Sequence, residues 1–171
     1  FNEQTGMHGA WLVGWQDEVV DPTGVTPVQL ELGGREKGQS ATFWGIGLRR
    51  FSQIRPHRIA DAPPITQPRN ERLGEQIGLL GYHLMENGDL LFFWKRLADD
   101  AQLAADYQMT GETVDAGGAV VARLADRRLS TYGYPVARWP MGETVMGHVP
   151  ATDWLGPTPA LGDYTLRLGV Y

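Results

Sequence analysis

The side chains best suited to bind a ligand lie in the longest loop that we expect in the C-terminal part of the chain. This loop, about residues 127–143, contains Tyr132, Tyr134, Arg138 and Trp139. Aromatic rings stack on the apolar face of a sugar ring, and a few polar groups bind its hydroxyls. These four residues, together with Trp154 in the following loop, are therefore candidate glycan-binding residues.

The same residues also fit a structural role. In that interpretation the rings anchor a long loop to the core, and Arg138 covers a neighbouring ring as a cation–π pair. Trp154, which lies between Asp153 and the Gly156-Pro157 turn, would be a loop anchor of the same kind. We favour the structural role, and keep glycan binding as the functional alternative.

Three carboxylates, Asp17, Glu18 and Asp21, gather where a strand is expected to end and a helix to begin. Such a group is able to bind a hard cation such as calcium or to serve as a general acid and base. Carboxylates at a helix N-terminus also cap its backbone N–H groups and compensate its dipole. Capping is the interpretation that we favour, and we predict no metal and no cofactor.

Composition argues against several classes of function. The net charge is −5 and the basic residues are dispersed, which disfavours a nucleic-acid-binding protein. The chain contains no cysteine, so disulfides and cysteine-ligated zinc are excluded. The four histidines show no metal-ligand spacing, and no nucleophile elbow, phosphate-binding loop or zinc-protease motif occurs. The sequence therefore predicts no catalytic residue.

The chain centres on a predicted hairpin at residues 77–97. In its first arm Leu80, Tyr82 and Leu84 alternate with smaller or polar residues, as in a half-buried strand. The second arm, residues 90–94, is apolar on both faces and is expected to be covered on both sides. Asn87-Gly88 between them is a typical type I′ turn.

Further short strands follow at about 106–114, 119–124, 144–149 and 163–171, separated by turn residues. Strands at this spacing are typical of an antiparallel sandwich. We therefore predict a mainly β protein, with an Ig-like or jelly-roll-like β-sandwich over residues 75–171.

The N-terminal part is expected to be a small strand–helix–strand unit over residues 9–52. A strand at 9–15 precedes a helix at about 22–32, whose start moves toward Thr26 because of Pro27, and a single strand follows at 42–51. Residues 53–74 are rich in proline and charge, and are expected to form a linker or a strap over the surface.

Several phrases in order resemble a known family. They are Trp11-Leu12-Val13 with residues 15–22, Leu80-Gly81-Tyr82, Asp106-Tyr107, Tyr134-Pro135 with Arg138-Trp139 and Gly142-Glu143, and residues 162–171. This order is similar to the soluble C-terminal region of bacterial polytopic membrane glycosyltransferases of the protein O-mannosyltransferase-like type.

The resemblance implies a non-catalytic accessory domain on the extracytoplasmic side of the membrane. The catalytic acidic residues of that family would lie in the membrane body, so none transfers to this chain. The sequence begins with Phe1 and contains no apolar run long enough to span a bilayer, so we expect a longer parent protein. The expected partners are the membrane-embedded part of that protein and a glycan or acceptor.

Other functions stay open at this point. The chain would be a free-standing carbohydrate-binding module if its loop aromatics were exposed. It would be a glycoside hydrolase if a cleft brought Asp17 together with Asp99 or Asp153, because that chemistry uses two facing carboxylates. A plain interaction domain, which pairs with its own membrane part or with a second copy, is the remaining alternative.

Overall fold

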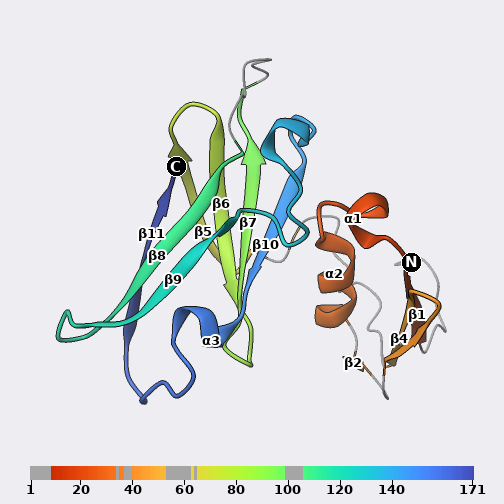
Figure 1. The fold of residues 1–171 in the computed structure, drawn as a ribbon, viewed down its shortest axis with the longest axis horizontal. Coiled ribbons are helices and arrows are strands. Elements are labelled where there is room, and N and C mark those ends of the chain that lie inside the picture. Colours follow the sequence, from red (N-terminus) through yellow and green to blue (C-terminus); the bar gives the residue numbers. More distant parts are fainter. Residues whose placement is uncertain (1–8, 34, 37–39, 53–62, 64, 99–105) are drawn as a thin grey trace. The chain divides into compact units, whose positions relative to one another are not determined.

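The computed structural model describes residues 9–33, 35–36, 40–52, 63, 65–98 and 106–171. The chain divides into two compact units, Phe1–Pro64 and Ile65–Tyr171. It is mainly β, with three antiparallel sheets (Figure 1), which confirms the predicted fold class.

The first unit is a small sheet with one helix packed on it. Its elements are β1 (Gly9–Gly14), α1 (Asp17–Val20), α2 (Val25–Gly33), β2 (Arg35–Glu36), β3 (Ala41–Phe43) and β4 (Ile46–Ser52). β4 pairs with β1, β2 and β3. Leu30 of α2 packs with Phe51, Ala10 and Leu12 on one face of the sheet, so the helix covers that face.

One local prediction in this unit is wrong and one is confirmed. The predicted strand at 42–51 is a hairpin, because Trp44 (φ 53°) and Gly45 (φ 80°) form a two-residue turn between β3 and β4. The helix begins at Val25, after the chain turns at Gly24 (φ 72°), which agrees with the start near Thr26 that Pro27 indicated. The short helix α1 was not expected.

The second unit is a two-layer sandwich. One sheet has the order β10-β7-β6-β5 and the other β11-β8-β9. Its elements are β5 (Gln67–Leu73), β6 (Ile77–Leu84), β7 (Leu90–Arg96), β8 (Gln108–Asp115), β9 (Val120–Arg128), the 3-10 helix η1 (Val136–Arg138), β10 (Thr144–Val149), α3 (Ala151–Trp154) and β11 (Tyr164–Val170).

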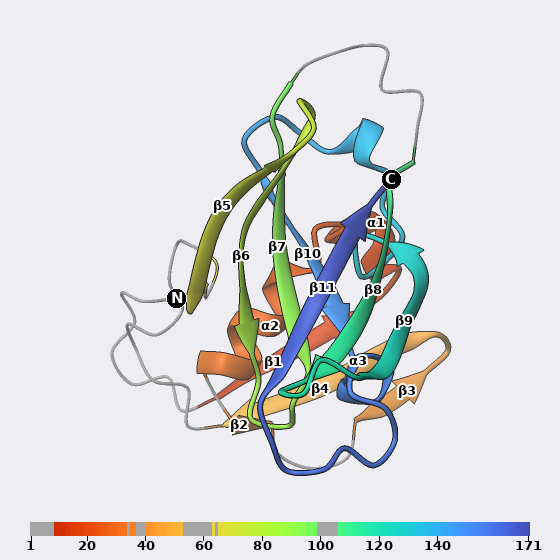
Figure 2. The ribbon, with the colours of Figure 1, turned by 90° about the vertical axis from the view of Figure 1, so that its left-hand side faces the viewer.

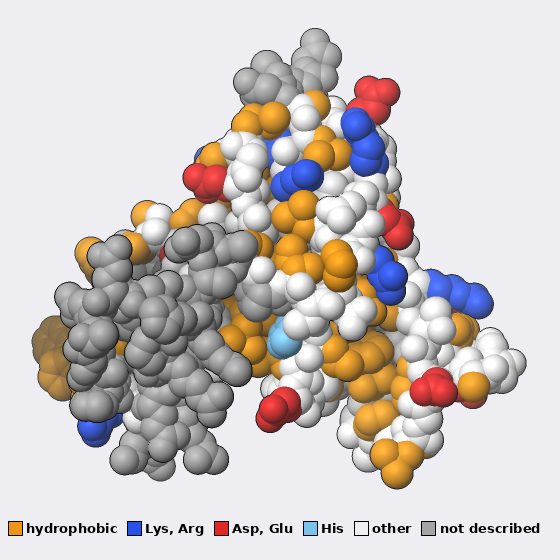
Figure 3. Space-filling view, turned by 180° about the vertical axis from the view of Figure 1, so that it is seen from behind, with side chains coloured by type: hydrophobic (Ala, Val, Ile, Leu, Met, Phe, Trp, Pro, Cys, Tyr) orange, Lys and Arg blue, Asp and Glu red, His pale blue; other side chains and the backbone are white. Residues whose placement is uncertain are grey.

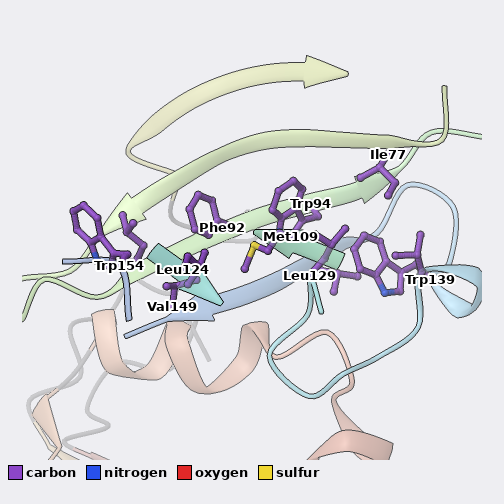
Figure 4. Packing of buried hydrophobic residues seen from close by; sticks show 12 residues of the cluster. Ile77, Phe92, Trp94, Met109, Leu124, Leu129, Trp139, Val149 and Trp154 are labelled. Carbon is purple, nitrogen blue, oxygen red and sulfur yellow. The ribbon is translucent and has the colours of Figure 1, made fainter. Parts of the chain in front are cut away.

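The predicted central hairpin is confirmed as β6 and β7. Phe92 and Trp94 of β7 are buried and point toward Met109 and Leu124 of the other sheet (Figure 4). The turn differs from the predicted type I′ turn. It runs from Met85 to Gly88, with the Gly88 N–H bonded to the Met85 carbonyl, and Gly88 has a positive φ (87°) whereas Asn87 does not. A β-bulge between Leu79 and Gly81 also shifts the alternation.

Residues 67–73 correct the predicted linker at 53–74. They form the edge strand β5, which pairs with β6 through a bulge between Pro68 and Glu71. Proline is tolerated there because an edge strand has one side on which no ladder hydrogen bond is needed. Residues 53–62 and 64 of the predicted linker lie outside the described residues.

The sandwich is closed along the side where β9 passes into β10. Thr131 donates its backbone N–H to the carbonyl of Met146 at 2.9 Å. Leu129 and Val145 are buried at this junction. The chain therefore joins the two sheets along one side, whereas β5 and β11 form their free edges elsewhere.

Candidate functional site

The candidate site is an apolar groove between the two sheets of the second unit. It encloses about 480 Å³, within the range of small-ligand sites. Figure 2 looks toward the sandwich with β5 and β6 on one side and β11, β8 and β9 on the other. The groove is lined by Arg69, Glu71, Leu73, Leu79, Tyr82, Leu84, Leu90, Phe92, Trp94, Trp154, Tyr164, Thr165, Leu166, Leu168 and Val170.

The groove exists because the two sheets are unequal. One sheet has the four strands β10-β7-β6-β5, and the path of the other has the three strands β11-β8-β9. Sheets that pack face to face cover each other only where both have strands. The inward residues of β11 remain half-buried, as do Leu79 and Tyr82 of β6, while Leu84 is exposed. Apolar side chains are therefore left without a covering layer.

Among the described strands β11 pairs with β8, and the hydrogen-bonding groups of its other edge can be assigned. Tyr171 and Gln108 exchange both of their backbone hydrogen bonds, each at 3.1 Å. The register from Val170 back to Tyr164 is regular, and bonded pairs alternate with non-bonded pairs in an antiparallel ladder. Tyr164, Leu166, Leu168 and Val170 therefore direct their N–H and C=O groups outward.

The same four residues send their side chains into the groove. An edge with outward hydrogen-bonding groups and a row of uncovered apolar side chains is a template for a further strand. One side chain on β11, that of Arg167, carries a charge, and the strand contains no proline. Chemically, β11 is prepared to accept an extended polypeptide.

The opposite edge, β5, is protected. It contains Pro68, a bulge and Asn70 with a positive φ of 56°, all of which discourage pairing with another strand. Arg69 lies over the ring of Tyr82, 5.4 Å from its centroid, at the rim of the groove. The groove therefore has one receptive edge and one blocked edge.

Electrostatics at the groove are weak. Arg69 and Glu71 are the charged residues among its described lining residues. Figure 3 shows basic and acidic side chains scattered over the face in view, with no large patch of either sign. On β6, partial burial lowers the pKa of His83, whose Nδ1 lies 3.1 Å from the hydroxyl of Thr66. Apolar contact and backbone hydrogen bonds are therefore the main binding forces that the groove offers.

Asp89 organises one end of the sandwich. Its carboxylate contacts His148 Nε2 at 2.8 Å and accepts the Ala151 backbone N–H at 2.9 Å, which caps α3. Trp154 of α3 donates its indole N–H to the carbonyl of Gly88 in the adjoining turn, at 2.9 Å. The cluster therefore holds α3, and with it the Trp154 ring, at the groove.

Burial by itself raises the pKa of the Asp89 carboxyl, but the hydrogen bonds from Ala151 and His148 outweigh it and lower that pKa below its usual value. The folded protein thus keeps this charge to a lower pH than the unfolded chain does. The stability that the ionised group contributes is complete above about pH 4 and is lost as the pH falls through the folded pKa.

We expect Asp89→Asn to flatten this acid dependence, because the variant has no charge to lose. Urea melts between about pH 2 and pH 7 should show a shallower fall in the free energy of unfolding below pH 4 than the parent shows. Asp163→Asn removes one exposed carboxylate outside the cluster and should retain the parental fall. Equal slopes for parent and Asp89→Asn would contradict the prediction.

The candidate loop aromatics lie mostly against the protein itself, which is the structural role that we favoured over glycan binding. Trp139 is 1% exposed and donates its indole N–H to the Tyr134 carbonyl at 2.9 Å. Tyr134 donates its hydroxyl to the Arg138 carbonyl. Tyr132 is half-buried and the Arg138 side chain is exposed. Of the five, Trp154 lines the groove, and a glycan role for the other four stays a prediction.

Among the acidic candidates, Asp21 and Asp153 each bond to groups of their own unit, and the side chain of Asp17 lies outside the described residues. Asp21 accepts the Thr26 backbone N–H at 3.0 Å and the Thr23 hydroxyl at 2.6 Å, which is the predicted capping role. In the part of the chain that the structure describes, no group of three His, Asp or Glu residues could hold a metal. Asp153 forms an ion pair with Arg127 at 2.9 Å, and Asp99 lies outside the described residues.

The sequence reasoning missed the groove although it recognised both of its walls. The alternation in residues 163–171 was correctly attributed to one face. In β6 the predicted face was Leu80, Tyr82 and Leu84. The bulge between Leu79 and Gly81 puts Leu79 in place of Leu80, so Leu79, Tyr82 and Leu84 line the groove. The missing signal was the number of strands in each sheet, which alternation alone does not reveal.

No family model, no curated protein and no solved structure matches this chain. Over the described residues, none of the helices has the length and apolar character needed to cross a membrane.

Proposed function

We propose that this chain is a non-catalytic accessory domain that binds an extended polypeptide in the groove of its second unit. The observation that carries the proposal is the free edge of β11, where outward backbone groups coincide with inward apolar side chains. Addition of a strand to an open sheet edge is an established mode of peptide recognition.

The bound segment would extend the sheet β11-β8-β9 by one strand. Its N–H and C=O groups would pair with those of Leu166 and Leu168, and every second side chain would enter the groove against Tyr82 and Leu84. The groove therefore selects a stretch of about seven residues, the length of β11, in which apolar and polar residues alternate.

The resemblance to membrane glycosyltransferases gives this role a setting. In that setting the domain lies on the extracytoplasmic side, belongs to a longer membrane protein, and holds the polypeptide acceptor near the enzyme. The resemblance alone supports the setting, whereas the groove supports the peptide-binding role independently.

A glycan is the less favoured ligand for this groove. Seven of its lining residues are leucine or valine, whereas a sugar presents hydroxyls that require several polar partners. Glu71 is the single carboxylate among the described lining residues, so the groove lacks the pair that a glycoside hydrolase uses.

Two substitutions at one position test strand addition. Leu166→Ala shortens a groove side chain but keeps its outward N–H, whereas Leu166→Pro also removes that N–H. The proline variant should fold because this N–H is not bonded to β8, and the alanine variant should fold because it keeps every backbone hydrogen bond. The probe is a fluorescently labelled peptide of alternating valine and threonine, flanked by lysines for solubility, and its anisotropy reports binding.

We expect the alanine variant to bind this peptide roughly tenfold more weakly, as for loss of one buried aliphatic side chain. The proline variant should lose binding altogether. A scrambled peptide of the same composition is the control. Equal affinities of the two variants would show that the groove takes an apolar ligand without strand pairing, and no binding by the parent would refute the proposal.

A further inference from the structure

The six tryptophans divide sharply between the two units. Trp94, Trp139 and Trp154 of the second unit are 0%, 1% and 8% exposed, and pack in its core. Trp11, Trp15 and Trp44 of the first unit are 63%, 56% and 91% exposed. Large aromatic rings usually leave water on folding, so three exposed ones in a small unit call for an external contact.

Two of these rings belong to one apolar surface, the outer face of the first unit's sheet. Trp11 lies opposite Arg50, Val13 opposite Leu48, and Phe43 opposite Ile46. Residues directly opposite each other share a face, and this face is the one turned away from Leu30 and Phe51. We call it the aromatic face and include in it Trp44, at the tip of the β3–β4 hairpin.

Trp44 occupies a backbone conformation that disfavours it. Its φ of 53° lies in the left-handed region, where asparagine and glycine are preferred and a bulky side chain is strained. At 91% exposure the ring gains almost no packing within the protein in return. A strained residue that contributes nothing to the core points to a role outside the fold.

We propose that the aromatic face docks onto the surface of a lipid bilayer. Tryptophan favours the boundary between headgroups and acyl chains, because its ring is apolar and its N–H remains hydrogen-bonded. Valine, leucine, isoleucine and phenylalanine supply the rest of the contact. Trp44, on a projecting hairpin tip, is placed to enter this layer first.

Charge on the aromatic face is complementary to lipid phosphate. Arg50 is the one charged residue that β1, β3 and β4 contribute to it, and its guanidinium lies 5.5 Å from the centre of the Trp11 ring. The carboxylate of Glu31 pairs with Arg49, which lies on the opposite face of the sheet, and not with Arg50. Arg50 therefore presents a cation beside an apolar ring, a pairing suited to an anionic headgroup.

The size of the aromatic face favours a bilayer over a folded protein partner. It comprises about seven side chains, whereas a stable protein interface uses roughly 20–30 residues on each side. A bilayer needs no matching shape and accepts a projecting ring. This proposal uses no residue of the groove, so it stands or falls separately from peptide binding.

The test is co-sedimentation of the full chain with vesicles of phosphatidylcholine, and with vesicles that also contain phosphatidylglycerol. Binding should shift tryptophan emission to shorter wavelengths, because the exposed rings of the first unit would leave water. The tryptophans of the second unit are already buried, so the change reports on the first unit. Both vesicle types should bind, and the anionic type more strongly. Arg50→Gln should remove that difference, while Arg72→Gln on β5 should retain it.

Trp44→Asn provides the decisive variant, because asparagine followed by glycine is the preferred sequence for this turn. Its urea midpoint should equal or exceed that of the parent, while its partitioning onto vesicles should weaken roughly tenfold, as for loss of one large apolar contact. Leu161→Asn, at a fully exposed leucine of the second unit, is the matched control and should bind as the parent does.

Three results would overturn the proposal. The first is that neither vesicle type binds the parent chain. The second is that Trp44→Asn binds as well as the parent, or that Leu161→Asn loses as much. The third is a dimer in sedimentation equilibrium that requires Trp44 and forms without vesicle binding, which would assign the aromatic face to a second copy.

Discussion

Replacement of Trp94 by alanine is expected to lower the free energy of unfolding by about 3–5 kcal/mol, the range for loss of a large buried aromatic side chain. Trp94 is 0% exposed and lies in the central strand β7. Its ring lies 5.8 Å from that of Phe92, and Phe92→Ala should have a similar cost for the same reason. The alanine variants leave a cavity between the two sheets, where neighbouring strands cannot collapse freely.

Urea denaturation, fitted for the midpoint and slope, measures this loss. Leu161→Ala is the control in the same unit, because that side chain is fully exposed and its removal should change stability by no more than about 0.5 kcal/mol. A cost below about 1 kcal/mol for both Trp94→Ala and Phe92→Ala would mean that β7 is not the centre of the core.

Gly147→Ala is the second substitution from which we expect a large effect. A Cβ at this position of β10 would lie 2.1 Å from the carbonyl oxygen of Leu129 and 3.2 Å from Trp94 Nε1. The first of these atoms belongs to the backbone that closes the sandwich between β9 and β10, so no flexible side chain can move aside. The strands themselves have to separate.

We expect this variant to lose about 3 kcal/mol of unfolding free energy or more, the upper end of the cost of overpacking a core. Urea melts give the loss, and proteolysis around residue 130 would report opening of the closed side. Gly162→Ala is the matched control, because a Cβ there meets no atom within 4 Å. Similar stabilities for the two alanine variants would show that the two strands do not approach so closely.

Local sequence signals were reliable where a pattern over a few neighbouring residues determines a strand or a turn. The alternation in residues 163–171, the continuous apolar run at 90–94 and the turn at Asn87-Gly88 predicted β11, β7 and the hairpin between β6 and β7. The cap at Asp21 was also predicted, because a short carboxylate before a helix has few better partners than free N–H groups.

Other features escaped prediction because distant segments create them. Residues 67–73 contain a proline and several charges, yet they form β5 since β6 offers them a partner. Trp44-Gly45 was assigned to a strand because residues 42–51 alternate between two faces, whereas the two residues have positive φ and form a turn. The burial of Trp139, by contrast, agrees with the favoured interpretation that the loop aromatics anchor their loop to the core.

The amino-acid sequence was therefore sufficient for the β character of the chain, for most strand positions and for the central hairpin of β6 and β7. These features depend on neighbours a few residues apart. Tertiary structure alone established the four-against-three arrangement of strands, the groove beside β11 and the aromatic face around Trp44. These depend on which strands pair and which faces remain uncovered, and those are properties of segments far apart in the chain.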